Sequence, residues 1–475
     1  MIESLAHRVF FVFESAIILY CFAINTTYFF LTVLAYFSLR KHHQPCSSAE
    51  RDALLKSPLM PAISVVVPTL NEAASCRDSV ASMLALNYPN YEVVVVNDGS
   101  GDDTLRILTE EFHLYKSARA ASGTLSTRPI RQIYESADPV RLVVVDKENG
   151  GKADAINAGL NVASSPLIMV VDSDSLIDRD GLFTMVRPYL EDPDRVIAVG
   201  GTVRVVNGCD VAHGQVRTIR SSSSHLANFQ SIEYLRAFLG GRVGFSLMNA
   251  LMIISGAFGL FRRDALIEAG GFDESTVGED MEVVVRLHRL WRTKKQPYRI
   301  AYMAAPACWT EVPHSLKILQ RQRKRWQRGT AESMWRHRAM LFNPRFGVVG
   351  MFSFPYFAIF EMLGPAIECL GYLLTILGLI FQMIAPEVAL LFFVVAVGFG
   401  VLLSTSALLL EEFTVHRYPS GWHSYRMLFS AIAENFGFRQ LMTLWRVQGL
   451  IEALKGKKGD WGAMERRGFK VVAGS

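Results

Sequence analysis

Two aspartates, Asp172 and Asp174, stand one residue apart directly after a short apolar run. Alternate residues of an extended segment share a face, so the two carboxylates are expected to lie side by side. Close carboxylates repel each other unless a cation lies between them, and hard oxygen ligands suit Mg²⁺ or Mn²⁺. Mg²⁺ usually completes its shell with water and substrate phosphates. The pair predicts a metal site for a diphosphate, but a DxD pattern is short and weakly specific by itself.

A second acidic group, Gly278-Glu279-Asp280, precedes a predicted helix over residues 281–292. One interpretation is a helix start whose acids complement the helix dipole. The other is a general base, a carboxylate held in a cleft that takes a proton from an acceptor hydroxyl. The pattern alone does not favour either interpretation.

Gly150-Gly151-Lys152 opens a predicted helix and suits an anion. Glycines allow close backbone approach, the helix N-terminus favours negative charge, and Lys152 adds a positive charge. The GxxxxGK[ST] spacing of a Walker loop is absent, and no GxGxxG follows a strand, which argues against a nicotinamide cofactor.

Gln322, Arg325 and Trp326 occur at i, i+3 and i+4, so they share one helix face. They lie just before an apolar zone, where a basic helix could rest on anionic lipid. Alternatively, Arg325 pairs with a phosphate while Trp326 supplies a flat platform for a ligand. Both interpretations can hold for different faces of the helix.

The elements that must position these residues alternate between strand and helix. Near-continuous Val and Ile runs at 63–68, 92–96, 141–145 and 167–171 predict strands buried on both faces, as in a parallel sheet. Residues 73–85 and 152–162 between them predict helices, so the fold class is α/β and doubly wound. Residues 112–140 are rich in Ser, Ala, Thr and Arg and predict a looser surface connection.

Polar residues follow the predicted strands. Ligands of open α/β sheets bind outside the carboxyl ends of the strands. Each residue alone has a simpler explanation as a turn or helix cap. Together they predict one crevice, formed by Thr69, Asn71, Glu72, Asp98, Asp172 and Asp174.

The remaining sequence is strongly apolar. Residues 9–39 exceed the roughly 20 apolar residues of a membrane span and are too long for a signal peptide. Arg40, Lys41, His42 and His43 follow and place the next domain in the cytoplasm. Residues 366–385 and 391–410 each fit a further span, and 346–363 is a third span or a re-entrant helix.

Glu361 and Glu368 lie in or beside this second apolar zone, with Pro365 as a predicted helix break between them. Such carboxyls face either a bundle interior or water cavity or the membrane interface. Residues 425–455 predict interfacial helices, and 461–469 a basic cytoplasmic tail. The six cysteines, Cys21, Cys46, Cys76, Cys209, Cys308 and Cys369, show no zinc spacing and are interpreted as reduced thiols.

Composition agrees with this division. The chain has 475 residues, of which 50% are hydrophobic and 20% charged, which excludes a disordered chain, a secreted disulfide scaffold and a simple soluble enzyme. Its net charge of +5 is too small to imply nucleic acid. We expect membrane segments at 1–45, a catalytic domain at 60–330, transmembrane and interfacial helices at 331–455, and a tail at 456–475.

Seven motifs in this order resemble the membrane-integrated, inverting family 2 glycosyltransferases, which include cellulose, chitin, hyaluronan and poly-N-acetylglucosamine synthases. The resemblance covers about residues 60–330. It rests on PTLNE (68–72), NDGS (97–100), GGKADAIN (150–157), DSD (172–174), SGAFGLFRR (255–263), GED (278–280) and QRKRW (322–326). Gly278 departs from the family, because many relatives have Thr there.

The resemblance implies a GT-A fold, a Rossmann-like, mostly parallel mixed sheet, beside a helical transmembrane domain. It assigns Asp280 as the catalytic base and Asp172 and Asp174 as ligands of Mg²⁺ or Mn²⁺, with Asp174 the direct ligand. The implied binding residues for the nucleotide sugar are Thr69, Glu72, Asp98, Lys152, Asp172, Gln322, Arg325 and Trp326. Those for the acceptor are Ser255, Gly256, Ala257, Glu279 and Trp326.

The implied reaction is inverting transfer from a UDP-sugar to a growing β-linked envelope or exported polysaccharide, processive and at the cytoplasmic membrane. The chain would be multi-pass with its catalytic domain in the cytoplasm, and accessory export subunits could assist it. One alternative is single transfer to a lipid acceptor such as a polyprenyl phosphate or diglyceride. Another is a catalytically silent membrane receptor that binds a nucleotide, against which Asp172, Asp174, Asp280 and Trp326 speak.

Overall fold

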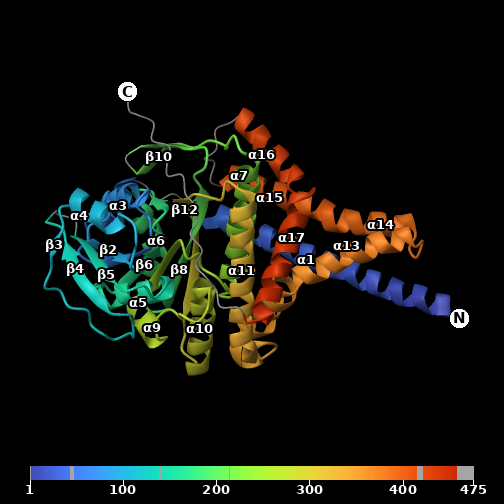
Figure 1. The fold of residues 1–475 in the computed structure, drawn as a ribbon, viewed down its shortest axis with the longest axis horizontal. Helices are drawn as coiled ribbons and strands as arrows, with labels where there is room; N and C mark the ends of the chain where they lie inside the picture. Colours follow the sequence, from blue (N-terminus) through green and yellow to red (C-terminus); the bar gives the residue numbers. More distant parts are fainter. Residues whose placement is uncertain (1, 43–47, 138–140, 213, 415–420, 457–475) are drawn as a thin grey trace.

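A mixed β-sheet forms the centre of the catalytic half of the molecule (Figure 1). The computed structural model describes residues 2–42, 48–137, 141–212, 214–414 and 421–456. Within these residues ten strands pair in the order β3-β4-β5-β2-β1-β6-β11-β8-β12-β7. In chain order they are β1 (Ile63–Thr69), β2 (Tyr91–Asn97), β3 (Tyr115–Lys116), β4 (Ile130–Glu135), β5 (Arg141–Lys147), β6 (Leu167–Val171), β7 (Ser175–Ile177), β8 (Val196–Val205), β11 (Phe258–Arg262) and β12 (Arg299–Thr310).

The sheet is parallel through β5, β2, β1 and β6 and mixed beyond them. Strand β11 is antiparallel to β6 and β8, whereas β8 and β12 run parallel. The expected mixed, mostly parallel sheet is therefore confirmed. Strands β9 (Asp210–Ala212) and β10 (Gln215–Thr218) form a separate antiparallel pair.

The four predicted strands are all present, and β6 has the predicted bounds. The loose connection predicted over residues 112–140 is wrong where β3 and β4 form. There, β4 pairs antiparallel with β5, and the two-residue strand β3 pairs antiparallel with β4 at the edge of the sheet. Only one residue of β4 is fully buried. A half-polar edge strand lacks the continuous apolar run that marks a central strand.

Helices cover both faces of the sheet. Val66, Val94 and Val96 pack on one face, and the alternate residues Val65 and Val67 pack on the other. One face carries α5 (Lys152–Val162), α9 (Arg263–Glu268) and α10 (Glu279–Lys294). The other carries α3 (Cys76–Leu84), α4 (Thr104–Glu111) and α6 (Gly181–Glu191), while α2 (Ser48–Leu55) precedes β1. Successive side chains of a strand point to opposite faces of the sheet. Because helices cover both faces, every residue of a central strand is buried, which explains the continuous Val runs.

One long helix, α11 (Leu316–Arg336), stands between the sheet domain and the apolar helices (Figure 1). On the sheet side it follows β12, and its Arg323 pairs with Glu233 of α7 (His225–Leu235). In the chain, α7 continues into the π-helical η1 (Arg236–Arg242) and α8 (Val243–Leu247). On the other side it packs along α17 (Phe438–Leu454). Side chains on this one helix therefore reach both parts of the molecule.

The apolar helices include segments that are long enough to cross a membrane. These are Phe10–Arg40 within α1 (Ile2–His42) and Pro386–Phe413, which spans α14 (Pro386–Phe393), η6 (Val394–Gly398) and most of α15 (Phe399–Thr414). Val349–Met362 and Gly364–Ile380 form a pair bent by 44°, a broken span or a re-entrant loop. This pair comprises η4 (Val349–Ser353), α12 (Phe354–Tyr356), η5 (Phe357–Met362) and α13 (Gly364–Ile380), and two short turns, η2 (Arg338–Met340) and η3 (Pro344–Phe346), precede it.

This arrangement corrects one expected span. Residues 366–385 are not a span of their own, because α13 ends at Ile380 and is the second half of the bent pair. The predicted break near Pro365 is confirmed, since the bend falls between Met362 and Gly364. Proline is tolerated in the first turn of a helix, but inside a helix it removes a backbone hydrogen bond.

The helices predicted as interfacial at 425–455 differ in how they pack. Helix α16 (Trp422–Ala433) exposes Trp422, Tyr425 and Phe429, as an interfacial helix would. Helix α17 instead packs on α11 and α13, because Trp445 and Leu450 are buried there. Leu444 and Leu454 of the same helix are exposed, so a position of α17 at the membrane interface stays a prediction.

Cysteine pairing follows the prediction where the structure describes it. Cys21, Cys76, Cys209, Cys308 and Cys369 are free thiols. Cys46, His43 and the tail 461–469 lie outside the described residues.

Candidate active site

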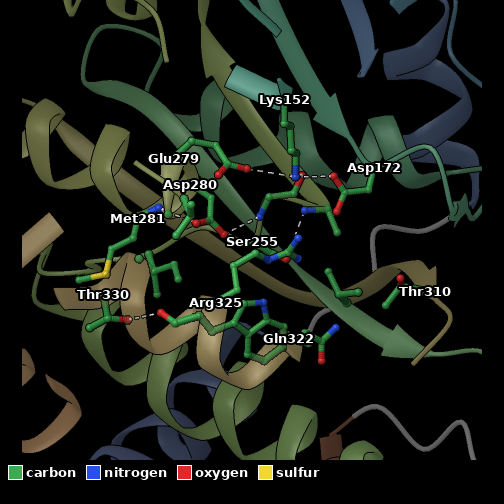
Figure 2. A pocket seen from close by; sticks show the side chains of 18 of the residues that line it. Lys152, Asp172, Ser255, Glu279, Asp280, Met281, Thr310, Gln322, Arg325 and Thr330 are labelled. Atoms are coloured by element: carbon green, nitrogen blue, oxygen red, sulfur yellow. Dashed lines mark hydrogen bonds and ion pairs between the residues drawn. The ribbon is translucent and has the colours of Figure 1, made fainter. Parts of the chain in front are cut away.

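A cavity of about 600 Å³ lies where the carboxyl ends of β1, β2 and β6 face α11 (Figure 2). It brings together every site residue predicted from the sequence. These are Thr69, Glu72, Asp98, Lys152, Asp172, Asp174, Ser255, Gly256, Ala257, Glu279, Asp280, Gln322, Arg325 and Trp326. Their roles stay predictions, but their convergence at the strand ends agrees with the rule for open α/β sheets.

Asp98 is the centre of a buried network on the sheet side of the cavity. Its carboxylate accepts hydrogen bonds from Lys147 Nζ at 2.7 Å, Gly150 N at 3.0 Å and Gly151 N at 2.8 Å. The N–H groups expected to receive a ligand anion at the start of α5 are thus already used by Asp98. Lys147, which the sequence analysis missed, also pairs with Asp154 and is fully buried.

Lys152 lies between two carboxylates at the start of α5 (Figure 2). Its Nζ is 2.5 Å from Asp172 Oδ1 and 3.3 Å from Glu279 Oε1. Burial by itself would lower the pKa of Lys152, but the carboxylates of Asp172 and Glu279 outweigh it and raise that pKa. Lys152 therefore stays protonated and supplies a fixed positive charge to the cavity.

Asp172 and Asp174 provide a hard-oxygen donor set at the end of β6. Asp174 is buried, whereas the Asp172 side chain is 31% exposed, and both line the cavity. No group of three or more His, Cys, Asp or Glu side chains in the described part of the chain is arranged to hold a metal by itself. The two carboxylates fit a cation that takes its other ligands from water and a diphosphate, as Mg²⁺ does.

Asp280 occupies the first turn of α10 and faces the loop before β11. Its Oδ2 accepts a hydrogen bond from Gly256 N at 3.1 Å, and its Oδ1 accepts one from Met281 N at 2.8 Å. A Cβ on Gly256 would lie 2.9 Å from Lys152 Nζ and 3.4 Å from Asp280 Cβ. The glycine therefore lets the loop pass between the cation and the carboxylate.

Glu279 differs from Asp280 in its environment. It is buried, and burial raises its pKa, with the charge of Asp280 adding to the rise and Lys152 opposing it. The helix-start interpretation of the acids also holds, because α10 begins at Glu279.

Helix α11 closes the opposite side with Gln322, Arg325 and Trp326, which share the predicted face. Gln322 Oε1 is buried and has no hydrogen-bond partner among the described residues. The Trp326 side chain is 42% exposed, and Arg323 stacks on it with Cζ 4.2 Å from the ring centroid. A flat aromatic surface beside a cavity suits the apolar face of a sugar ring or a base.

Comparison with known proteins decides the family. A family model described as "Glycosyltransferase like family 2" matches residues 61–329. The chain belongs to this family. Its catalytic half is a glycosyltransferase domain, as the seven motifs predicted.

Curated relatives of this glycosyltransferase include poly-beta-1,6-N-acetyl-D-glucosamine synthases of two species. The protein from Staphylococcus aureus is 31% identical and the one from Staphylococcus epidermidis 32% identical, each over 275 residues. The match covers 58% of this chain and 56% of each relative, so it spans about half the length of the curated relatives.

Two solved structures are more distant. A mannosyltransferase from Pyrobaculum calidifontis, in complex with GDP-Man and Mn²⁺, is 19% identical with a TM-score of 0.49, covering 94% of this chain and 99% of its own. TarS of S. aureus is 18% identical with a TM-score of 0.36, covering 58% of this chain and 39% of its own.

The glycosyltransferase cavity also contains residues that the sequence analysis missed. Arg242, at the end of η1, lines it with Nη1 buried and without a partner among the described residues. Tyr28 and Arg446 were also missed, and they line the end nearest the apolar helices together with Glu361, which the sequence had singled out. Arg446 Nη2 lies 3.1 Å from Glu361 Oε2, and Tyr28 donates to the same carboxylate. No local motif marks these residues, because they come from helices far apart in the chain.

Glu361 and Glu368 resolve the two interpretations of the acids beside Pro365. Glu361 borders the cavity, and Glu368 accepts hydrogen bonds from Tyr372 and Thr443 while lying 3.8 Å from Arg439. Both carboxylates therefore face the interior between helices, where arginines offset the cost of their burial.

Proposed function

We propose that this chain transfers a sugar from a UDP-sugar, with inversion at the anomeric carbon, to a growing β-linked polysaccharide at the cytoplasmic membrane. One observation carries the proposal. A single cavity joins the Asp172–Asp174 pair, the Lys152 cation and the Asp280 carboxylate with the Gln322, Arg325 and Trp326 face of α11. Leaving-group stabilisation, proton removal and acceptor binding can therefore occur together.

The donor diphosphate would lie between the strand ends and Lys152. The positive charge of Lys152, and of Arg325 from the other side, would stabilise the charge that grows on the departing UDP. Fixed charges in a partly buried site act more strongly than the same charges in water.

Asp172 and Asp174 would hold the divalent cation, which supplies positive charge to the diphosphate when it is bound. The donor set supports this role, because both groups are carboxylates at one strand end. The enzyme should therefore be sensitive to chelators. Removal of divalent ions with a chelator should abolish sugar transfer, and added Mg²⁺ or Mn²⁺ should restore it.

Asp280 would act as the base. Its carboxylate would take the proton of the acceptor hydroxyl while that oxygen forms a bond to the anomeric carbon. The bond from that carbon to the UDP oxygen breaks on the opposite face, and UDP leaves with the electron pair. Direct displacement inverts the configuration, so an α-linked donor yields a β-linkage. Gly256 N would hold the carboxylate in place, since it donates to Oδ2.

The acceptor would lie at the α11 end of the cavity, over Trp326. The cavity continues from there to Tyr28, Glu361 and Arg446, which are on helices of the apolar half. An acceptor chain that leaves toward these helices would suit an envelope or exported polymer, and this supports a multi-pass membrane enzyme with a cytoplasmic catalytic domain. Accessory subunits could carry the product onward.

The test is turnover by the full-length protein in detergent or vesicles. UDP release would be measured with a panel of UDP-sugars in Mg²⁺ or Mn²⁺, followed by linkage analysis of the product. We expect release with one donor and a β-linked product. If no common UDP-sugar is turned over, the silent nucleotide-binding receptor becomes the better interpretation.

Product size separates polymer synthesis from single transfer. A processive enzyme should yield long chains while most acceptors remain unused. One sugar for each polyprenyl phosphate or diglyceride acceptor would contradict polymer synthesis and support the lipid glycosyltransferase instead.

A further inference from the structure

The part of α11 that follows Trp326 contacts the loop that leads into Asp280. This loop, residues 276–278, lies between α9 and α10, and Val277 and Gly278 line the cavity. The same helix therefore presents Arg325 and Trp326 to the cavity and, one to two turns later, touches the segment that delivers the acids. The distance from the Arg325 and Trp326 side chains to the acids Glu279 and Asp280 therefore depends on this contact.

Glu332 makes the polar part of the contact. Its Oε2 accepts hydrogen bonds from Thr276 Oγ1 and from Val277 N, both at 3.0 Å. The Thr276 hydroxyl in turn accepts a hydrogen bond from Gly278 N at 3.1 Å. Arg328, one turn earlier on α11, donates to Glu332 Oε1 at 2.6 Å. The carboxylate thus connects the helix to consecutive residues of the loop.

Two glycines make the close part of the contact. A Cβ on Gly329 would lie 2.7 Å from Gly278 Cα, and a Cβ on Gly278 would lie 2.8 Å from Gly329 Cα. Backbone meets backbone here, so no flexible side chain could move aside to admit a methyl group. This gives Gly278, the departure from the family pattern, a physical reason: a threonine would push α11 away from the loop.

We propose that Glu332 is a positioning residue of the transfer reaction. Its carboxylate, oriented by Arg328, holds the loop against α11 across the Gly278–Gly329 contact. It thereby sets the separation between the Asp280 carboxylate and the Arg325 and Trp326 side chains. This inference rests on the proposed function, since it concerns the alignment of the base with the acceptor and diphosphate.

A second ion pair on α11 serves as a matched control. Lys324 pairs with Glu452 of α17, and the Glu452 side chain is 29% exposed against 23% for Glu332. Both glutamates pair with a basic residue of α11, but among the described residues the hydrogen bonds from the loop before Asp280 go to Glu332 and not to Glu452. Removing it tests the loss of a helix-bound ion pair without the loss of the loop contact.

The experiment compares Glu332→Ala, Glu332→Gln and Glu452→Ala in the full-length protein. It measures kcat and KM for the donor, the affinity for UDP, and hydrogen exchange of the loop amides. We expect Glu332→Ala to lower kcat at least about tenfold, since a misplacement of 1 Å can cost about a hundredfold. UDP affinity should stay within about twofold of wild type, because the sheet side still provides the strand-end groups and Lys152.

Glu332→Gln should recover part of kcat, because its amide oxygen still accepts from Val277 N. Loop exchange should rise in Glu332→Ala and stay unchanged in Glu452→Ala, whose kcat should remain near wild type. The proposal is overturned if Glu332→Ala retains wild-type kcat, or if its kcat falls no further than that of Glu452→Ala. It is also overturned if UDP affinity falls in parallel with kcat, which indicates general unfolding.

Wild-type turnover separates this proposal from the proposed function. An active wild type with an equally active Glu332→Ala contradicts the positioning role alone. A wild type that releases no UDP from any donor contradicts both, because there is then no transfer to position.

Discussion

The two sides of the active-site cavity are built in different ways. On the sheet side, backbone register does most of the positioning: Thr69 pairs with Asn97, and Asn97 pairs with Asp146 in the neighbouring strand. Asp98, which follows β2, and Lys147, the last residue of β5, therefore lie side by side. On the α11 side, individual side chains from distant segments hold the helix.

The hydrogen bonds of Gln327 on α11 show this difference directly. Gln327 Nε2 donates to the backbone oxygens of Glu361 at 3.0 Å and Met362 at 2.8 Å, at the bend of the apolar helix pair. Arg446 of α17 donates to Gln327 Oε1 at 2.7 Å. The sheet side is thus a consequence of regular strand pairing, whereas the α11 side depends on the packing of the apolar helices. Damage to each side should have a different functional signature.

The largest expected effect concerns the proposed base Asp280, which lies in the first turn of α10. Asp280→Asn should lower kcat by about 10²–10⁴-fold, because the amide cannot take a proton. UDP affinity, which the sheet side supplies, should stay nearly unchanged. Steady-state UDP release and calorimetric UDP binding measure the two quantities.

Asp264→Asn is the control for this change, since Asp264 is 68% exposed on α9 and outside the cavity. A loss of UDP binding in Asp280→Asn would mean that Asp280 is structural and that the two sides are not separable.

On the sheet side, Asp98→Ala should weaken UDP binding and destabilise the domain together. It removes one of the acceptors of buried Lys147 and the acceptor of two backbone N–H groups, at a cost of about 3 kcal/mol. Thermal unfolding with and without UDP would detect both effects. Unchanged UDP affinity with a lower kcat would contradict the assignment of Asp98 to the donor side.

Acid should destabilise the catalytic domain through His288. This buried residue of α10 contacts Tyr298 at 2.6 Å and the Leu251 oxygen at 2.8 Å, and burial lowers the pKa of His288 from 6.5 to about 4, with nearby Arg292 adding to the effect. The unfolded chain then binds more protons than the native one between these pH values. Stability is therefore present above pH 6.5 and is lost as the pH falls toward 4, by about 3 kcal/mol.

The measurement is the unfolding midpoint between pH 7 and pH 4 in wild type and in His288→Gln. The variant should show a flatter dependence on pH in this window. Equal slopes would remove His288 as the cause.

The smallest expected effect concerns the tie between α11 and the apolar helices. Gln327→Ala removes the hydrogen bonds at the helix bend and should cost about 1–2 kcal/mol. It should lower kcat several-fold without changing UDP affinity. Gln320→Ala is the matched control, because Gln320 bonds to Gln448 of α17 at an exposed position. Similar kcat values in both variants would show that the hydrogen bonds from Gln327 to the helix bend do not affect the position of α11 in catalysis.

Much of the catalytic fold could be predicted because its strands are apolar on both faces. Only burial in a covered sheet explains such runs, and β6 and α5 have the predicted bounds. The edge strands β3 and β4 were missed because a half-polar strand lacks that signal. The span predicted at 366–385 was wrong because hydropathy registers length and composition but not the bend before Gly364.

The site divides in the same way. Asp98, Asp172 and Asp280 were predicted from local patterns, and all three line the cavity. Lys147 and Arg242 were missed, because a lone basic residue carries no spacing signal. Their importance comes from burial beside the cavity, which no local pattern records.

The sequence by itself determined the alternation of strands and helices, the apolar segments and the chemical types of the site residues. Local propensity, hydrophobic periodicity and motif order are all properties of short stretches of chain. The tertiary structure decided where α11 stands, that Gly278 meets Gly329, and that Asp98 uses the N–H groups at the start of α5. Those outcomes depend on side chains from distant segments competing for the same partners and space, and only packing in three dimensions settles that competition.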